Sequence, residues 1–167
     1  MVLTKSELIK SLQTEVRIAV HLVGKVDRTK LDYRPSANQR STIELLRYLA
    51  MMGPEVVKAA TTGTFDSESW TAAEKAVASY DVDQVVAAIA AQSDAYTKLL
   101  AGVSDADLRV EIEMFGQKDT RGAYLVNLAL ASCIAYRMQL FLYLKASGRA
   151  ELNTMNLWAG MDAPMPG

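Results

Sequence analysis

Four polar side chains recur along one face of an otherwise apolar segment near the C-terminus. Ser132, Tyr136, Gln139 and Tyr143 lie at offsets of 0, 4, 7 and 11 within SCIAYRMQLFLYLKASG, residues 132–148. On an α-helix this spacing places them on one stripe. Hydroxyl and amide groups can bind a ligand, but a Ser nucleophile needs an activating base and none is evident. The stripe therefore indicates either an interhelical polar network or a pocket lined by Tyr and Ser.

Two further side chains with possible chemistry stand alone. His21 is the single histidine, and the helical wheel of residues 8–26 puts it nearly opposite the apolar face, so we expect it at the surface or at an interface. Cys133 is the single cysteine and lies in an apolar helix, where such a thiol usually packs as a small hydrophobe. For both residues these interpretations are favoured over catalytic or ligand-binding roles.

A basic cluster occupies the loop after the first helical segment. Asp27 and Asp32 partly offset its charge, and no glycine-rich cradle accompanies it. The cluster therefore fits a solvated loop better than a phosphate site. Its members are Lys25, Arg28, Lys30, Arg34 and Arg40.

The composition indicates one globular domain spanning residues 1–167. Hydrophobic residues make up 50% and charged residues 22%, which suits a single core and not a disordered chain. A formal charge of −1 gives no overall field to attract nucleic acid or an anionic membrane. One cysteine allows no intrachain disulfide, and MVLTKSELIK does not resemble a signal peptide, so we expect a cytoplasmic protein. The longest apolar region, 122–144, is interrupted by polar residues, which favours a buried bundle helix over a membrane span.

Helical periodicity appears four times, so helices must position the residues described above. Capping-box patterns start the first two segments, TKSE from Thr4 and STIE from Ser41. Gly53-Pro54 interrupts the second segment, where we predict a kink. The segments run from about 4 to 26, 41 to 60, 82 to 101 and 120 to 146.

The connections between these segments are unequal in length. Residues 27–40 form a loop, and 61–80 form a long crossover with a short helical turn near 71–79. Residues 103–119 include RVEIEMF, where alternation indicates an extended piece. The tail, 149–167, is too short to fold alone and is expected to dock. Long crossovers between four helices predict an all-α four-helix bundle whose neighbours are not sequential.

Two motifs in this order resemble the DinB/YfiT-like superfamily. STIELLRYL, 41–49, is similar to its second-helix signature, S-[IT]-x-E-L-L-x-H-[IL]. YRMQLFLYLKASG, 136–148, is similar to its fourth-helix signature, H-R-x-Q-L-x-x-Y-L-[RK]-x-x-G. YRPS before the second helix and TRGAYL before the fourth also match the family's usual pattern.

The resemblance implies an up-down-down-up four-helix bundle, often a homodimer, that commonly holds nickel or zinc with three histidines. Some members are thiol-dependent S-transferases or isomerases. Carried over residue by residue, the three ligand positions fall on Tyr48, Ser132 and Tyr136, with Gln139 near the edge of the same pocket. Neutral Ser and protonated Tyr are poor ligands, and a single histidine cannot form a three-histidine site. The metal-activated chemistry of the family is therefore not expected, and no metal or cofactor is predicted.

Two interpretations of the function follow from this resemblance. The first is a metal-free, homodimeric, small-molecule-binding or non-catalytic bundle that does not bind nucleic acid or membrane. The alternative is a metal-independent enzyme that uses the same pocket, with Tyr48 and Tyr136 as donors or acids and Ser132 positioning substrate. Two Tyr and a Ser without a base are poorly equipped for acid–base work, so the first interpretation is favoured.

Overall fold

The long helices begin where the sequence supplies a capping side chain. The computed structural model describes residues 3–164. In α1 (Lys5–Val23) the cap is Thr4, in α2 (Thr42–Thr62) it is Ser41, and in α4 (Val82–Leu99) it is Asp81. Each cap side chain accepts a hydrogen bond from the backbone N–H three residues on, and the side chain of that residue accepts one from the backbone N–H of the cap. The two predicted capping boxes are confirmed, and Asp81 adds a third.

The fourth long segment is one helical rod with a wider turn inside it. It comprises α5 (Arg121–Tyr124), a π-helical stretch (Leu125–Leu130) and α6 (Ala131–Ala146). Thr120 caps its start by accepting from the backbone N–H of Ala123. A π-helical stretch has more residues per turn, so the face presented to the bundle shifts between the two halves of the rod.

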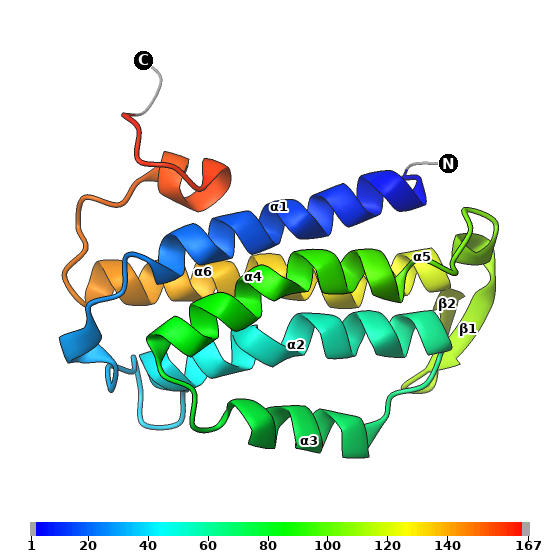
Figure 1. Ribbon diagram of the computed structural model, residues 1–167, viewed down its shortest axis with the longest axis horizontal. Helices are drawn as coiled ribbons and strands as arrows, with labels where there is room; N and C mark the ends of the chain where they lie inside the picture. Colours follow the sequence, from blue (N-terminus) through cyan, green and yellow to red (C-terminus); the bar gives the residue numbers. More distant parts are fainter. Residues whose placement is uncertain (1–2, 165–167) are drawn as a thin grey trace.

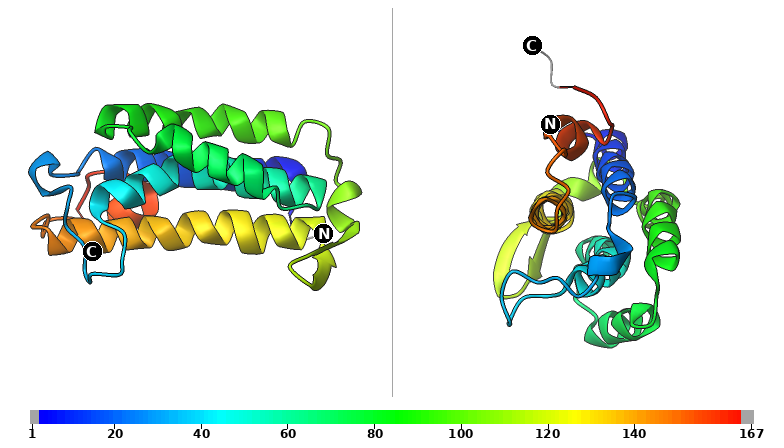
Figure 2. Two further views of the ribbon diagram at one scale, coloured as in Figure 1. Left: turned by 90° about the horizontal axis from the view of Figure 1, so that it is seen from below. Right: turned by 90° about the vertical axis from the view of Figure 1, so that its left-hand side faces the viewer.

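The four long segments run side by side in the predicted up-down-down-up order. In Figure 1, α1 and α6 run in one direction, whereas α2 and α4 run in the other. Both α1 and α2 pack against α4 and α6, and their apolar faces form the core. The end-on view in Figure 2 shows α3 (Ser67–Val77) outside this set, beside α2. The prediction of an all-α bundle is confirmed.

The crossover between the parallel helices α2 and α4 is more ordered than the sequence analysis predicted. We expected a helical turn near 71–79, but α3 begins at Ser67 and runs for 11 residues. Its N-cap, Asp66, accepts hydrogen bonds from the backbone N–H groups of Glu68 and Ser69. An N-cap of this kind satisfies the first free amides and stabilises an early helix start.

The extended piece expected within 103–119 is a β-hairpin. β1 (Glu111–Met114) pairs antiparallel with β2 (Gln117–Thr120), with Glu111 opposite Thr120. Phe115 and Gly116 form the two-residue turn, with φ values of 54° and 73°. Two positive φ values match the twist of a tight hairpin. Short 3₁₀ turns occur at Arg28–Lys30 and Asp107–Arg109.

Helix α2 continues through Gly53-Pro54, where we predicted an interruption. Pro54 has no N–H, so the carbonyl of Ala50 lacks its usual intrahelical donor. Gln92 of α4 replaces it, because its Nε2 donates to Ala50 O at 3.0 Å and to Leu49 O at 2.8 Å. A buried side chain from a neighbouring helix thus satisfies the acceptor that proline leaves free.

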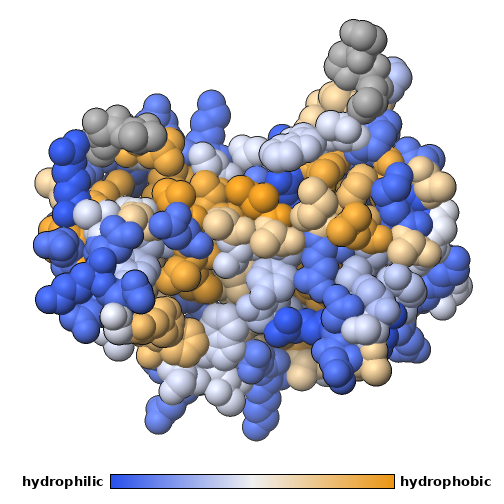
Figure 3. Space-filling view, turned by 180° about the vertical axis from the view of Figure 1, so that it is seen from behind, coloured by the Kyte–Doolittle hydropathy of each residue, from blue (hydrophilic) through white to orange (hydrophobic). Residues whose placement is uncertain are grey.

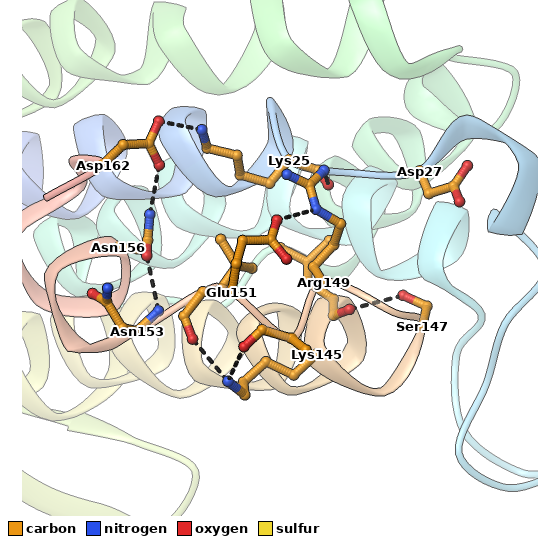
Figure 4. A network of polar contacts seen from close by, with 12 residues as sticks. Lys25, Asp27, Lys145, Ser147, Arg149, Glu151, Asn153, Asn156 and Asp162 are labelled. Atoms are coloured by element: carbon orange, nitrogen blue, oxygen red, sulfur yellow. Dashed lines mark hydrogen bonds and ion pairs between the residues drawn. The ribbon is translucent and has the colours of Figure 1, made fainter. Parts of the chain in front are cut away.

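The tail docks on the bundle, as predicted. Its π-helical turn (Met155–Ala159) packs against α1, and Arg17 donates to Ala159 O at 2.5 Å. Figure 4 shows the polar contacts of this region, including the bonds from Lys25 and Asn156 to Asp162. Gly160 has a φ of 59°, and a Cβ there would lie 3.1 Å from the Cα of Ile18. A glycine is therefore required where the tail turns against α1.

The rod 121–146 is long and apolar enough to cross a membrane by length and composition. In the structure it packs against α1 and α2 as one of the four bundle helices. This placement favours the predicted interpretation of a bundle helix over a membrane span.

Candidate functional site

The predicted ligand positions lie where α2 faces the fourth helical rod. Tyr48 on α2 and Tyr136 on α6 are both partly buried, and their ring centroids are 4.8 Å apart at an interplanar angle of 64°. Ser132 lies one turn before Tyr136 on α6 and is also partly buried. The structure thus brings Tyr48 and Tyr136 together from distant parts of the sequence. That these residues, with Gln139, line a small polar pocket stays a prediction.

Tyr48 has cationic and aromatic neighbours on its other sides. The guanidinium carbon of Arg40 lies 4.0 Å from the centroid of its ring, within the range of a cation–π interaction. The ring of Trp70, from α3, lies 6.0 Å away. Burial, with the adjacent Tyr136 as a smaller contribution, raises the pKa of the Tyr48 hydroxyl well above its ordinary value. The phenol is therefore neutral at physiological pH, which suits packing and does not suit metal ligation.

The second half of the polar stripe serves as a hydrogen-bonded anchor. Gln139 Nε2 donates to the Tyr143 hydroxyl at 2.8 Å, and that hydroxyl donates to Arg40 O at 2.9 Å. The Tyr143 ring is buried and lies 5.7 Å from that of Tyr33 in an edge-to-face contact. This half of the stripe fixes the loop before α2 against α6. Gln139 therefore takes part in a polar network that joins α6 to a loop, whereas the predicted alternative was a network between helices.

The basic loop residues are held by contacts within the chain. Arg28 binds Asp83 through two hydrogen bonds of 2.9 and 2.5 Å. Lys30 donates to Ser147 O at 2.6 Å, and Arg34 lies 3.3 Å from Glu44. With Lys25 on Asp162 and Arg40 over Tyr48, all five cations have intramolecular partners. These contacts provide no support for a phosphate site in this loop.

His21 and Cys133 take no part in the ring contact between Tyr48 and Tyr136. His21 points out of the bundle as predicted, but the tail covers it, and Asn156 lies 3.1 Å from its Nε2. Burial is the largest effect on its pKa, which is lowered despite Asp162 nearby. Cys133 is partly buried beside Tyr96, and burial raises the pKa of its thiol to about 11, so the thiol is protonated at neutral pH. Among residues 3–164, no three His, Cys, Asp or Glu side chains gather closely enough to hold a metal ion.

A buried polar layer at mid-bundle was missed by the sequence analysis. The guanidinium of Arg137 on α6, only 2% exposed, lies 2.8 Å from the carboxylate of Glu15 on α1. Arg137 also donates to Leu157 O and lies 5.3 Å from the ring of Trp158 in the tail. The signal was present in the heptad-like spacing, because Glu15 and Arg137 both occupy apolar-stripe positions. These stripes are Leu8-Leu12-Glu15-Ala19-Leu22 and Leu130-Cys133-Arg137-Leu140-Leu144.

The same layer continues across α4 and α2. The Tyr96 hydroxyl donates to Gln92 Oε1 at 2.9 Å and lies 3.8 Å from the sulfur of Cys133. Glu15, Gln92, Tyr96 and Cys133 contribute to the lining of a cavity of about 20 Å³, close to the room that one water molecule needs. Burial raises the pKa of Glu15, and Arg137 only partly opposes this effect. The layer therefore resembles a structural network more than an exposed reaction centre.

The geometry defines an all-α bundle with a short helix in the crossover and an aromatic contact at the position of the expected ligands. This is the DinB-like fold. A DinB-like protein, YjoA, from Bacillus subtilis superposes with a TM-score of 0.67 at 19% identity, covering 87% of this chain and 94% of that one. A DinB-like protein from Bacillus cereus gives 0.69 at 14% identity, covering 89% and 95%. No protein-family model matches the sequence, and no curated protein matches it significantly.

These similarities confirm the resemblance at the level of the fold. Because both identities are below one fifth, they carry no information on the activity of this chain.

Proposed function

We propose that this protein is a metal-free, non-catalytic member of the DinB-like fold that binds a small molecule as a cytoplasmic homodimer. The observation that carries the proposal is the ring contact between Tyr48 and Tyr136 at two of the expected ligand positions. Two neutral aromatic groups there stabilise the α2–α6 contact by packing. The single histidine of the chain lies elsewhere, under the tail.

The enzymatic alternative is less well supported by the electrostatics. A Tyr that acts as a general acid or base works best when its pKa lies near the operating pH. Burial moves the pKa of Tyr48 in the opposite direction, away from neutrality. The resulting donor can orient a ligand but transfers a proton poorly.

The purified protein should contain well under one equivalent of nickel, zinc or manganese per chain. Neutral Tyr and Ser oxygens are weak ligands, so metal should not contribute to folding. Elemental analysis measures the content, and thermal unfolding with and without chelator should give the same Tm. Stoichiometric metal that survives dialysis, together with a chelator-sensitive Tm, would contradict the proposal.

The homodimer is proposed from the outward face of α6. Met138 is 38% exposed and Leu142 is 56% exposed, although both belong to a largely apolar helix. Figure 3 shows apolar side chains gathered in a band across the back of the molecule, the side on which α6 lies. Phe141, which lies between them in the sequence, is buried. Continuous exposed apolar surface is typical of a protein interface, and a symmetric dimer would cover it.

Light scattering at micromolar concentration should therefore give twice the chain mass. The double substitution Met138→Glu, Leu142→Glu places charges on this face and should yield a folded monomer. A monomeric mass for the parent protein would contradict the homodimer and would mean that a second chain does not cover this face.

A further inference from the structure

A cleft opens between the C-terminal half of α2 and the start of α3. Its volume is about 520 Å³, within the range of small-molecule sites. Its position lies outside the four-helix core, because α3 packs only on the α2 side of the bundle (Figure 2). The lining residues that matter for recognition are Glu55, Lys58, Phe65, Asp66, Glu68 and Trp70.

One wall of the cleft is aromatic. Phe65 and Trp70 have ring centroids 5.5 Å apart with an interplanar angle of 45°. Phe65 is 39% exposed although it is a large apolar side chain. The ring centroid of Phe115, in the hairpin turn, lies 5.6 Å from that of Phe65, and the centroid of Tyr48 lies 6.0 Å from that of Trp70. The wall is therefore held in place by further rings and offers an accessible π surface.

The charge of the cleft is negative. Three carboxylates, Glu55, Asp66 and Glu68, face a single ammonium, Lys58. Lys58 Nζ donates to Ser69 Oγ at 2.7 Å, and Ser69 Oγ donates to Glu55 Oε2 at 2.8 Å, so the ammonium is already engaged. The Asp66 carboxylate accepts from the first free amides of α3. Lys58, Glu55 and Asp66 thus each have a hydrogen-bond partner within the chain, and Glu68 is exposed, so the excess of carboxylates over the single ammonium gives the cleft its negative charge.

We propose that this cleft binds a small organic cation, an ammonium group carried on an apolar or aromatic body. The ammonium would lie against the face of Trp70 or Phe65 and near the carboxylates, since aromatic faces and carboxylates both attract desolvated cations. The inference rests on the proposed small-molecule-binding role and gives it a place and a ligand class. It is independent of the metal content, so its failure can be told apart from a failure of the metal-free proposal.

The test uses Trp70 as the reporter. The chain has two tryptophans, and Trp158→Phe leaves Trp70 as the only one. This variant is titrated with benzyltrimethylammonium, with the neutral benzyl alcohol and with the anionic benzenesulfonate. The cation should change the fluorescence saturably and bind about tenfold more tightly than the alcohol, while the anion should bind most weakly. Calorimetry on the unmodified protein checks that the Trp158 change does not create the signal.

Matched charge variants separate the cleft from general electrostatics. The double variant Glu55→Gln, Glu68→Gln should weaken binding of the cation about fivefold or more. Glu68→Gln alone should also weaken binding, and because Glu68 is exposed this substitution should leave the fold intact. Asp94→Asn removes an equally exposed carboxylate on α4, outside the cleft, and should leave binding unchanged. The proposal is overturned if the cation gives no saturable signal at millimolar concentration by either method. Equal binding of cation and alcohol, or equal loss in Asp94→Asn, would overturn it as well.

Discussion

Replacing Arg137 with Met should lower the free energy of unfolding by about 3–5 kcal/mol, because it leaves the Glu15 carboxylate buried without its partner. Arg137 contacts both the buried polar layer and the tail. Its guanidinium lies 2.8 Å from Glu15 and also donates to Leu157 O in the tail. Urea unfolding measures the stability, and faster proteolysis of the tail should accompany the loss.

The double variant Glu15→Leu, Arg137→Met should recover much of this loss, since apolar residues of similar volume can replace a buried ion pair at little cost. The matched control is Arg28→Met, which breaks the exposed pair with Asp83 and should cost about 0–1 kcal/mol. If Arg137→Met costs no more than Arg28→Met, the interaction with Glu15 is not a buried ion pair in solution.

The pH dependence of the Arg137→Met variant follows from the Glu15 carboxyl. Burial raises the pKa of Glu15, and the opposing effect of Arg137 is absent in the variant. Between the ordinary pKa of glutamate and this raised value, the native state binds more protons than the unfolded state, so stability falls as pH rises. The free energy of unfolding of the variant should therefore be closest to that of the parent at mildly acidic pH and furthest below it at neutral pH. An equal deficit at both pH values would contradict a buried charge.

Gly53→Ala should destabilise the protein by about 2–3 kcal/mol, although alanine normally favours a helix. A Cβ at this position would collide with the Tyr96 hydroxyl and lie 3.1 Å from Gln92 Oε1. Tyr96 is fully buried and cannot move aside easily. The collision would displace Tyr96 and its hydrogen-bond partner Gln92, whose Nε2 links α4 to α2 beside Pro54.

The rescue experiment uses Tyr96→Phe. Removing the hydroxyl clears the nearest obstacle, so Gly53→Ala should cost less in the Tyr96→Phe background than in the parent. Thermal or urea unfolding of the two single variants and the double variant gives this difference directly. Additive effects would show that the Tyr96 hydroxyl is not what requires glycine.

Local patterns in the sequence predicted the helix starts and the direction of His21. Thr4 and Ser41 cap helices because their interactions span only three residues, which a sequence displays directly. The outward direction of His21 followed from helix geometry. That the tail covers His21 could not be predicted in this way, because Asn156 lies 135 positions away and reaches His21 only when the tail docks.

Most of the missed features depend on contacts between distant parts of the chain, whereas the start of α3 has a local N-cap, Asp66. Glu15 stands in an apolar stripe and could have been placed in the core, but its partner on α6 could not be deduced from spacing within either helix. The full length of helix α3 was not predicted because the helix has little apolar periodicity, with Val77 its one buried residue. The interruption expected at Gly53-Pro54 does not occur, and Gln92 from another helix supplies the donor that proline lacks. At the candidate site, the motif resemblance placed Tyr48 and Tyr136, and the fold supplied their ring contact.

The most direct test of the central claim is calorimetric titration of the triple variant Tyr48→His, Ser132→His, Tyr136→His with nickel or zinc, beside the parent protein. The claim is that these residues occupy the metal-binding position of the fold with aromatic and hydroxyl groups in place of ligands. Three imidazoles from two rigid helices should create a site near one equivalent, with stronger binding above about pH 6.5, where histidine is neutral. The parent should show no such site. A folded triple variant that binds metal no better than the parent would contradict the placement of all three residues.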